Sequence, residues 1–114
     1  MSLIYKIVSQ TAWTAAKAAG AFNGAEIDLK DGYIHLSTAA QAAETARRHF
    51  AGVEGLVLVA FHAEGLRDLK WEPSRGGDLF PHVYGALDPT LAVAVTPLPL
   101  NAAGWPDPGE LAGA

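Results

Sequence analysis

Residues 31–41 read DGYIHLSTAAQ, and they set the fold of the first half of the chain. The Asp-Gly pair is a turn signal, and apolar and polar residues alternate after it, as in a strand with one buried face. Thr38 and Gln41 then form a capping-box pattern, in which the two side chains satisfy free backbone N–H groups where a helix begins. We therefore predict a strand over residues 33–37 that passes directly into a helix over 38–51.

Apolar runs separated by turn signals predict the remaining elements. Ile27 and Leu29 lie between two turn signals and are expected to form a short extended piece. The run from Leu56 to Phe61 is apolar on both faces, which is typical of a central buried strand. The resulting order, β-α-β-α-β-β-β-β, predicts a compact single-domain α+β fold. We expect strands over residues 3–8, 33–37, 56–61, 69–72, 79–84 and 91–96, and helices over 12–19 and 38–51.

Length and composition agree with one domain. The chain has 114 residues, of which 50% are hydrophobic and 18% are charged, as in ordinary globular proteins. We assign residues 1–100 to the domain. Residues 101–114 are rich in Pro, Gly and Ala and are expected to form a loose C-terminal tail, in which Trp105 is the residue placed to pack back onto the body.

Charge and residue usage exclude several classes of function. The net charge of −4 and the pI near 5.4 disfavour a long nucleic acid as partner, because such binding needs a basic surface. The absence of Cys excludes disulfides, a thiolate nucleophile and Cys-ligated zinc. No run reaches the roughly 18 apolar residues of a membrane helix, so no membrane partner is expected. The N-terminus, MSLIYKIV, shows no basic region and no cleavage signal, which predicts a cytoplasmic protein.

Two histidines occur in matching strand patterns. Tyr33, His35 and Ser37 share one strand face, and Phe80, His82 and Tyr84 share another. Two such patterns predict a cleft with aromatic walls and imidazole donors. The alternative is that each histidine is a satisfied core or edge residue bonded to a carbonyl group.

The turn WEPSRGGD, residues 71–78, contains the second candidate group. Gly76 and Gly77 permit positive φ, so backbone N–H groups can converge into an anion-binding nest. Arg75 adds a planar guanidinium suited to phosphate or carboxylate. The alternative is an ordinary hairpin turn with a solvated arginine.

Glu72 and Lys6 are open to two interpretations each. Glu72 is either a general base or ribose-binding group, or the partner of Arg75 or Lys70 across the turn. Lys6 lies in an apolar run; an inward orientation requires an anionic partner or a bound anion, and the alternative is an edge strand from which it reaches solvent.

Other side chains carry weaker signals. A zinc site from His35, His82 and Glu72 lacks local ligand spacing, so we predict no metal. The run Arg47-Arg48-His49 is interpreted as a solvated face at the end of a helix.

Three sequence blocks in this order resemble one family. They are IYKIV at 4–8, DGYIHLSTAAQ at 31–41 and LKWEPSRGGDLFPHVYG at 69–85. The chain from Ile4 to about Leu100 is thereby similar to the bacterial domain-of-unknown-function family numbered 952. That family looks like a distant member of the ADP-ribosyltransferase superfamily, which implies a bent or split, mostly antiparallel sheet.

The superfamily resemblance implies a cleft for NAD or a related ADP-ribose compound. Lys6 takes the first-strand position as a phosphate contact, and His35 is the better candidate for a ribose or phosphate contact. His82 takes the late-strand position where active transferases often carry Glu. A histidine cannot stabilise an oxocarbenium-like centre by negative charge, so Glu72 substitutes only if it faces the cleft. Phosphate-directed chemistry on a small nucleotide fits this basic set better than ADP-ribosyl transfer to protein.

Two hypotheses from different classes follow. The first is a cleft that binds NAD, ADP-ribose or a related phosphorylated nucleotide, with transfer or hydrolysis at the ribose or phosphate. The second is a non-catalytic ligand-binding or interaction module with the same fold. In the first hypothesis the catalytic residues are His35, His82 and Glu72, and the ligand-binding residues are Lys6, Ser37, Arg75, Gly76, Gly77 and Tyr84.

Overall fold

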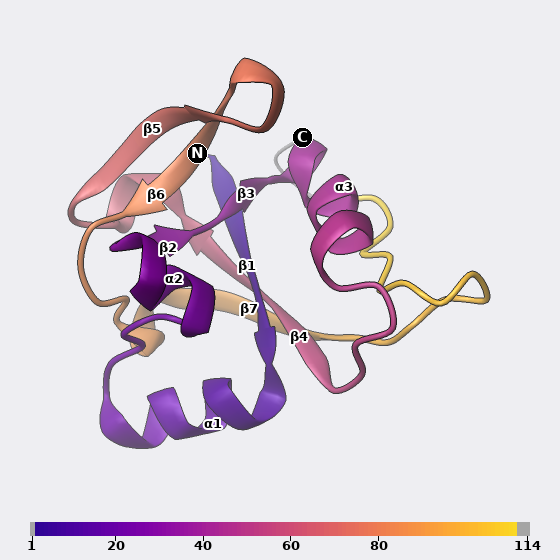
Figure 1. The fold of residues 1–114 in the computed structure, drawn as a ribbon. Coiled ribbons are helices and arrows are strands. Elements are labelled where there is room, and N and C mark those ends of the chain that lie inside the picture. Colours follow the sequence, from indigo (N-terminus) through magenta and orange to yellow (C-terminus); the bar gives the residue numbers. More distant parts are fainter. Residues whose placement is uncertain (1, 112–114) are drawn as a thin grey trace.

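The computed structural model describes residues 2–111, apart from the side chain of Arg75, and divides the strands between two antiparallel sheets (Figure 1). The strands are β1 (Leu3–Ser9), β2 (Ile34–His35), β3 (Ser37–Thr38), β4 (Leu56–His62), β5 (Leu69–Ser74), β6 (Asp78–Val83) and β7 (Ala92–Leu98). The helices are α1 (Gln10–Ala19), α2 (Glu26–Asp31) and α3 (Ala39–His49), with 3₁₀ turns at Ala63–Gly65, Arg75–Gly77 and Pro89–Leu91. The α+β class and the antiparallel pairing predicted from the sequence are thus confirmed.

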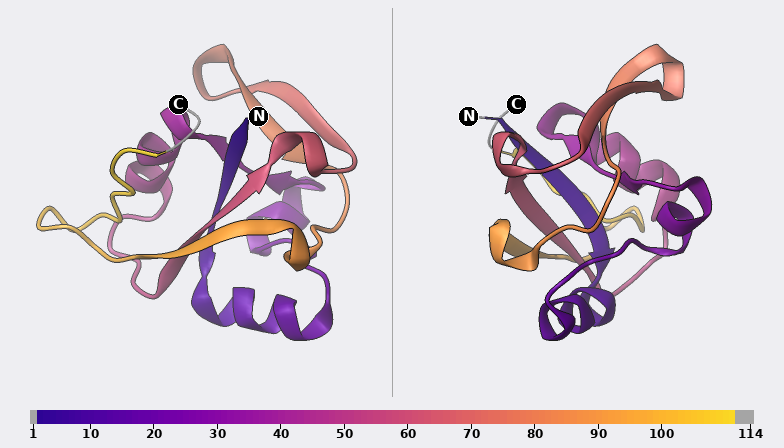
Figure 2. Two further views of the ribbon diagram at one scale, coloured as in Figure 1. Left: turned by 180° about the vertical axis from the view of Figure 1, so that it is seen from behind. Right: turned by 90° about the vertical axis from the view of Figure 1, so that its left-hand side faces the viewer.

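The larger sheet has the order β3-β1-β4-β7. Strand β4 lies between β1 and β7, and its residues Leu56 to Phe61 are buried, which confirms the central buried strand. The smaller sheet has the order β2-β6-β5. Both views of Figure 2 show that the turn joining β5 and β6 projects away from the rest of the molecule.

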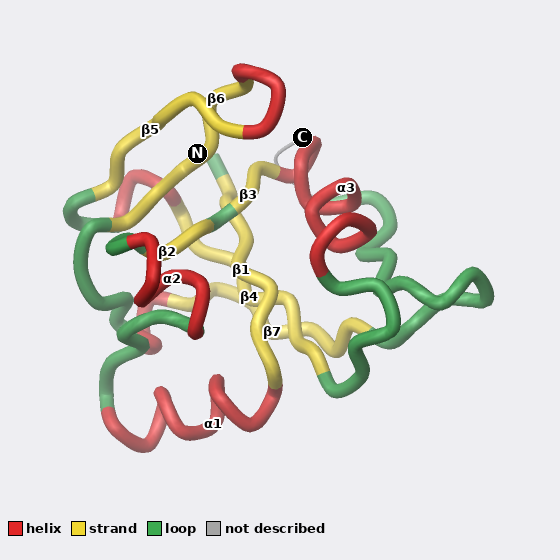
Figure 3. Tube along the Cα trace, in the orientation of Figure 1, coloured by secondary structure: helices red, strands yellow, loops and turns green. Residues whose placement is uncertain are grey.

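The segment predicted as one strand over 33–37 is divided between the two sheets (Figure 3). His35 pairs with His82 of β6, whereas Ser37 pairs with Tyr5 of β1. Between them Leu36 is buried, and its N–H donates to the carbonyl of Pro81. The alternating pattern therefore predicted extended backbone correctly, but it did not reveal that the chain changes sheets at Leu36.

Helix α2 corrects the expectation of an extended piece at Ile27 and Leu29. The Asp28 carboxylate accepts a hydrogen bond from the N–H of Ala25 at 2.8 Å, as the third residue of a capping box does. The helix ends at Asp31 and is followed by Gly32, which has φ +88°. Ile27 and Leu29 are 53% and 67% exposed, so their alternation does not mark a buried strand face.

Helix α3 begins where the capping box places it. The N–H of Gln41 donates to Thr38 Oγ1, and the N–H of Thr38 donates to Gln41 Oε1. The helix ends at His49, two residues before the expected end. The Gln41 side chain also donates to the carbonyl of Leu79, which ties α3 to the hairpin of β5 and β6.

Two apolar clusters cover the two faces of the larger sheet. The first contains Val59 together with Trp13 from α1, and the second contains Leu58 together with Ala46 from α3. Trp105, in the C-terminal segment, packs against the second cluster. Among the described residues, no helix has both the length and the apolar character needed to cross a membrane.

Candidate functional site

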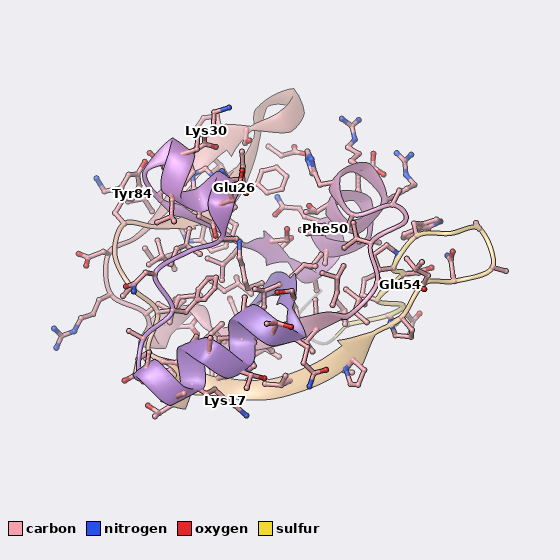
Figure 4. The ribbon with its side chains drawn as sticks, turned by 60° about the horizontal axis from the view of Figure 1, so that its bottom comes forward. Lys17, Glu26, Lys30, Phe50, Glu54 and Tyr84 are labelled. Atoms are coloured by element: carbon pink, nitrogen blue, oxygen red, sulfur yellow. The ribbon has the colours of Figure 1, made fainter. Side chains whose placement is uncertain are left out.

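A cleft of about 470 Å³ opens between α2 and α3 beside the β5–β6 hairpin. Figure 4 shows its two sides, with Glu26 and Lys30 labelled on α2 and Phe50 at the end of α3. The apolar lining comprises Ile7, Ile27, Leu36, Phe50 and Phe80. The polar lining comprises Tyr5, Lys6, Asp31, His35, Ser37, Thr45, His49, Ser74 and His82.

The structure brings His35 and His82 together in this cleft. Their strands are paired in register, and the two ring centroids lie 5.5 Å apart with an interplanar angle of 70°. Tyr33 packs against both rings, at 4.7 Å from His35 and 4.2 Å from His82. Tyr84 lies 5.2 Å from Tyr33 and completes a cluster of four rings.

The buried carboxylate of Asp28 organises the His35 side of the site. It contacts the Lys6 ammonium at 2.8 Å and accepts hydrogen bonds from the backbone N–H of His35 at 3.1 Å. His35 Nδ1 lies 2.7 Å from Asp28 Oδ1. Lys6 also donates to the carbonyl of His35 at 3.0 Å. One carboxylate thus fixes both the backbone and the ring of His35.

Asp28 is ionised despite its burial. Burial alone would raise the pKa of the Asp28 carboxyl, but the hydrogen bond with His35 and the charge of Lys6 outweigh it. The net effect holds the pKa of Asp28 far below its ordinary value. Lys6 therefore faces inward with an anionic partner, and the edge-strand interpretation is wrong because β1 lies between β3 and β4.

The second ring nitrogen of His35 meets a different carboxylate. His35 Nε2 lies 2.9 Å from Asp31 Oδ2, on the last residue of α2. The Asp31 side chain is 37% exposed, whereas that of Asp28 is 1% exposed. The His35 ring is thus held by one buried and one accessible carboxylate.

Glu72 positions His82 in a similar way. Its Oε1 lies 2.8 Å from His82 Nδ1 and accepts a hydrogen bond from the Tyr84 hydroxyl at 2.7 Å. The bonds from Tyr84 and His82 lower the pKa of Glu72, and the bond to Glu72 raises the pKa of Tyr84 to about 12. An ionised carboxylate only accepts, so His82 Nδ1 donates to Glu72, and among the described residues Nε2 of His82 has no hydrogen-bond partner.

Several other predicted site residues are placed as follows. The Ser37 and Thr45 hydroxyls lie 3.0 Å apart in the cleft wall. Gly76 and Gly77 both have positive φ, +78° and +90°, but the described lining of the cleft includes neither glycine. The side chain of Arg75 lies outside the described part of the structure.

Sequence reasoning missed three residues of the site, Asp28, Asp31 and His49, and one contact of a fourth residue, Tyr33. Asp28 and Asp31 were counted only as part of a polar, turn-rich segment, although an inward Lys6 was itself a signal for a carboxylate partner. Tyr33 was recognised as an aromatic wall without its contact to His82. His49, interpreted as part of a solvated face, lines the cleft.

The arrangement suits oxyanion binding and proton transfer. Two adjacent imidazoles, each oriented at Nδ1 by a carboxylate, can donate to an oxyanion or move a proton. Among the described residues, no group of three or more His, Cys, Asp or Glu side chains is arranged to hold a metal ion.

Solved structures share this fold over nearly the whole chain. The crystal structure of protein CC0527 from Caulobacter crescentus is 51% identical, with a TM-score of 0.90, over 93% of this chain and 94% of that chain. The solution NMR structure of CC0527 is 52% identical, with a TM-score of 0.84, over 93% and 92% of the two chains. Comparison with curated proteins gives no match. The family model described as protein of unknown function (DUF952) matches residues 7–95, and the chain belongs to this family.

Proposed function

We propose that this DUF952 protein binds a small phosphorylated nucleotide, of the NAD or ADP-ribose class, in the cleft between α2 and α3. The observation that carries the proposal is the juxtaposition of His35 and His82, whose ring centroids lie 5.5 Å apart in the wall of one cleft. Residues 47 positions apart in the chain are brought together by strand pairing rather than by local sequence.

The cleft has the size and chemistry of a small-molecule site. Its volume of about 470 Å³ lies within the range of roughly 300–1,000 Å³ that is typical of ligand pockets. The apolar wall, with Phe80 and Ile27, accommodates the base and the carbon face of a ribose. The imidazoles of His35 and His82 and the hydroxyl of Ser37 provide hydrogen bonds for phosphate oxygens.

A distant relationship to the ADP-ribosyltransferase superfamily is part of the proposal. In this chain the carboxylate of Glu72 is engaged by His82 and Tyr84. It therefore acts on the ligand through His82 rather than by direct charge stabilisation at the ribose. We accordingly favour transfer or hydrolysis at a phosphate over ADP-ribosyl transfer to protein.

The proposal is tested by thermal unfolding of the wild-type protein with NAD, ADP-ribose and AMP at millimolar concentration. A ligand at 100 times its Kd stabilises the folded state by about 2.7 kcal/mol, which raises Tm by about 10 °C in a domain of this size. We expect a shift with at least one nucleotide and its loss in His82→Gln. The control, His62→Gln, changes a histidine outside the cleft lining and keeps the shift. No shift with any nucleotide would reject the proposal.

A binding module without catalytic activity is the second candidate. It is favoured by the mutual pairing of the charged groups, since Lys6 is engaged by Asp28 and Glu72 by His82 and Tyr84. Phosphorus NMR of a bound nucleotide over hours separates the two candidates. Unchanged resonances identify a module, and new phosphorus resonances in wild type that are absent in His82→Gln identify an enzyme.

A further inference from the structure

The contact between Asp31 and His35 has a consequence for ligand selection. We propose that Asp31 is a specificity-determining residue, because its carboxylate occupies the place at His35 Nε2 that the oxyanion of a ligand takes on binding. The inference rests on the proposed function, since it concerns the anionic end of the ligand in the same cleft. The anionic end of the ligand is thereby inferred to be an oxyanion that can replace the Asp31 carboxylate at His35.

The two carboxylates at His35 differ in how firmly they are held. Asp28 is almost fully buried and is bonded to Lys6, to the N–H of Ala25 and to both the backbone and Nδ1 of His35. Asp31 is 37% exposed, and its side chain makes one ion pair among the described residues, with His35 Nε2. It is also the last residue of a six-residue helix, next to Gly32 in the left-handed region.

The energies typical of buried and exposed ion pairs also indicate that Asp31 is held less firmly than Asp28. Removing one partner of a buried ion pair is strongly destabilising, whereas an exposed ion pair contributes little to stability. An incoming oxyanion therefore displaces Asp31 at small cost, while Asp28 keeps the ring of His35 in place. Nε2 of His35 and Nε2 of His82 then become available to one ligand.

This competition filters anions by their number of acceptor atoms. A simple carboxylate offers His35 no more than Asp31 already does, and Asp31 has the advantage of being tethered beside the ring. A phosphate group has one more terminal oxygen than a carboxylate and more negative charge, so it can bond His35 and His82 and still accept a further hydrogen bond. The site should therefore accept phosphate groups in preference to carboxylates, and Asp31 sets that preference.

The test compares Asp31→Asn with Glu26→Gln. Both variants remove one negative charge from α2, but Glu26 does not line the cleft. Binding of inorganic phosphate, acetate and ADP-ribose is followed by NMR titration of the ring nitrogens of His35 and His82. We expect Asp31→Asn to bind phosphate about two- to fivefold more tightly than wild type, the range that corresponds to an exposed ion pair. The same variant should bind acetate measurably, and Glu26→Gln should resemble wild type.

The outcomes separate this inference from the proposed function. Phosphate binding that is no tighter in Asp31→Asn than in wild type or in Glu26→Gln overturns the inference, and so does failure of phosphate to bind any of the three proteins. Tighter phosphate binding without any response to nucleotides supports the role of Asp31 and rejects the nucleotide. Asp31→Ser, which removes the carboxylate with a different side chain, must repeat the effect.

Discussion

At the scale of single residues, the most informative side chain is Lys6. Its apolar neighbours showed that an inward ammonium needs an anion, but no local pattern named the partner. The structure supplies Asp28, 22 positions later, with the ammonium and carboxylate 2.8 Å apart and both side chains buried. The ion pair in turn determines the position of His35. Lys6 thus contributes to the cleft by fixing its wall, and any contact of Lys6 with a ligand stays a prediction.

Replacement of Lys6 tests this role. Lys6→Met leaves the Asp28 carboxylate buried without its cation, so we expect a loss of about 3–5 kcal/mol in the free energy of unfolding. The measurement is urea denaturation followed by circular dichroism. Lys17→Met, on the exposed face of α1, serves as the control (Figure 4) and should change stability by less than about 0.5 kcal/mol. Equal stabilities of Lys6→Met and wild type would contradict the structural role.

At the scale of elements, α2 and α3 form the two sides of the cleft. The sequence predicted α3 but not α2. The capping box of Thr38 and Gln41 is a local signal, because the two backbone N–H groups it satisfies lie three residues apart in the chain. Helix α2 has only half of such a box, made by Asp28 with Ala25, and its exposed Ile27 and Leu29 imitate an alternating strand. The pattern of apolar residues therefore did not predict α2, which is short and buries little surface.

The cap of α3 is tested by Thr38→Ala. Loss of the hydroxyl leaves the N–H of Gln41 without its side-chain acceptor, and we expect a cost of about 0.5–2 kcal/mol. Thermal and urea unfolding provide the measurement. Thr38→Ser retains the hydroxyl and should recover most of the loss. If the serine variant is as unstable as the alanine variant, packing of the methyl group rather than capping explains the effect.

At the scale of the whole molecule, two small sheets and a C-terminal segment together cover the core. The segment after β7 returns to the body, where Trp105 packs against the second apolar cluster. The carbonyl of Gly104 accepts a hydrogen bond from the N–H of Gly52 at 2.7 Å, which joins the segment to the end of α3. The sequence predicts a loose tail here from its Pro, Gly and Ala content, with Trp105 as the residue placed to pack back onto the body, and the structure shows that contact of Trp105.

Trp105→Ala measures the contribution of this segment. We expect the free energy of unfolding to fall by about 1–3 kcal/mol, because a half-buried aromatic side chain is removed from the second cluster. Trp71→Ala removes an equally large side chain that is 43% exposed on β5 and should cost clearly less. Similar losses in the two variants, measured by denaturant unfolding, would argue against anchoring by Trp105.

Local chemistry accounts for what could be read from the amino acids without coordinates. Apolar runs located β1, β4 and β6, the capping box located α3, and the strand alternation located His35 and Ser37 in strands, whereas Tyr33 lies in the bend before β2. Each of these signals arises between residues a few positions apart, where backbone geometry limits the choices. Family membership followed from the same blocks.

The site itself required long-range pairing. The chain changes sheets at Leu36, and this places His35 beside His82 and opens the cleft between α2 and α3. Glu72 reaches His82 because β5 pairs with β6, and Asp28 reaches His35 because helix α2 packs beside β2. Such contacts depend on the total burial of apolar surface and on the pairing of buried charges over the whole chain. A short segment of sequence therefore does not predict them.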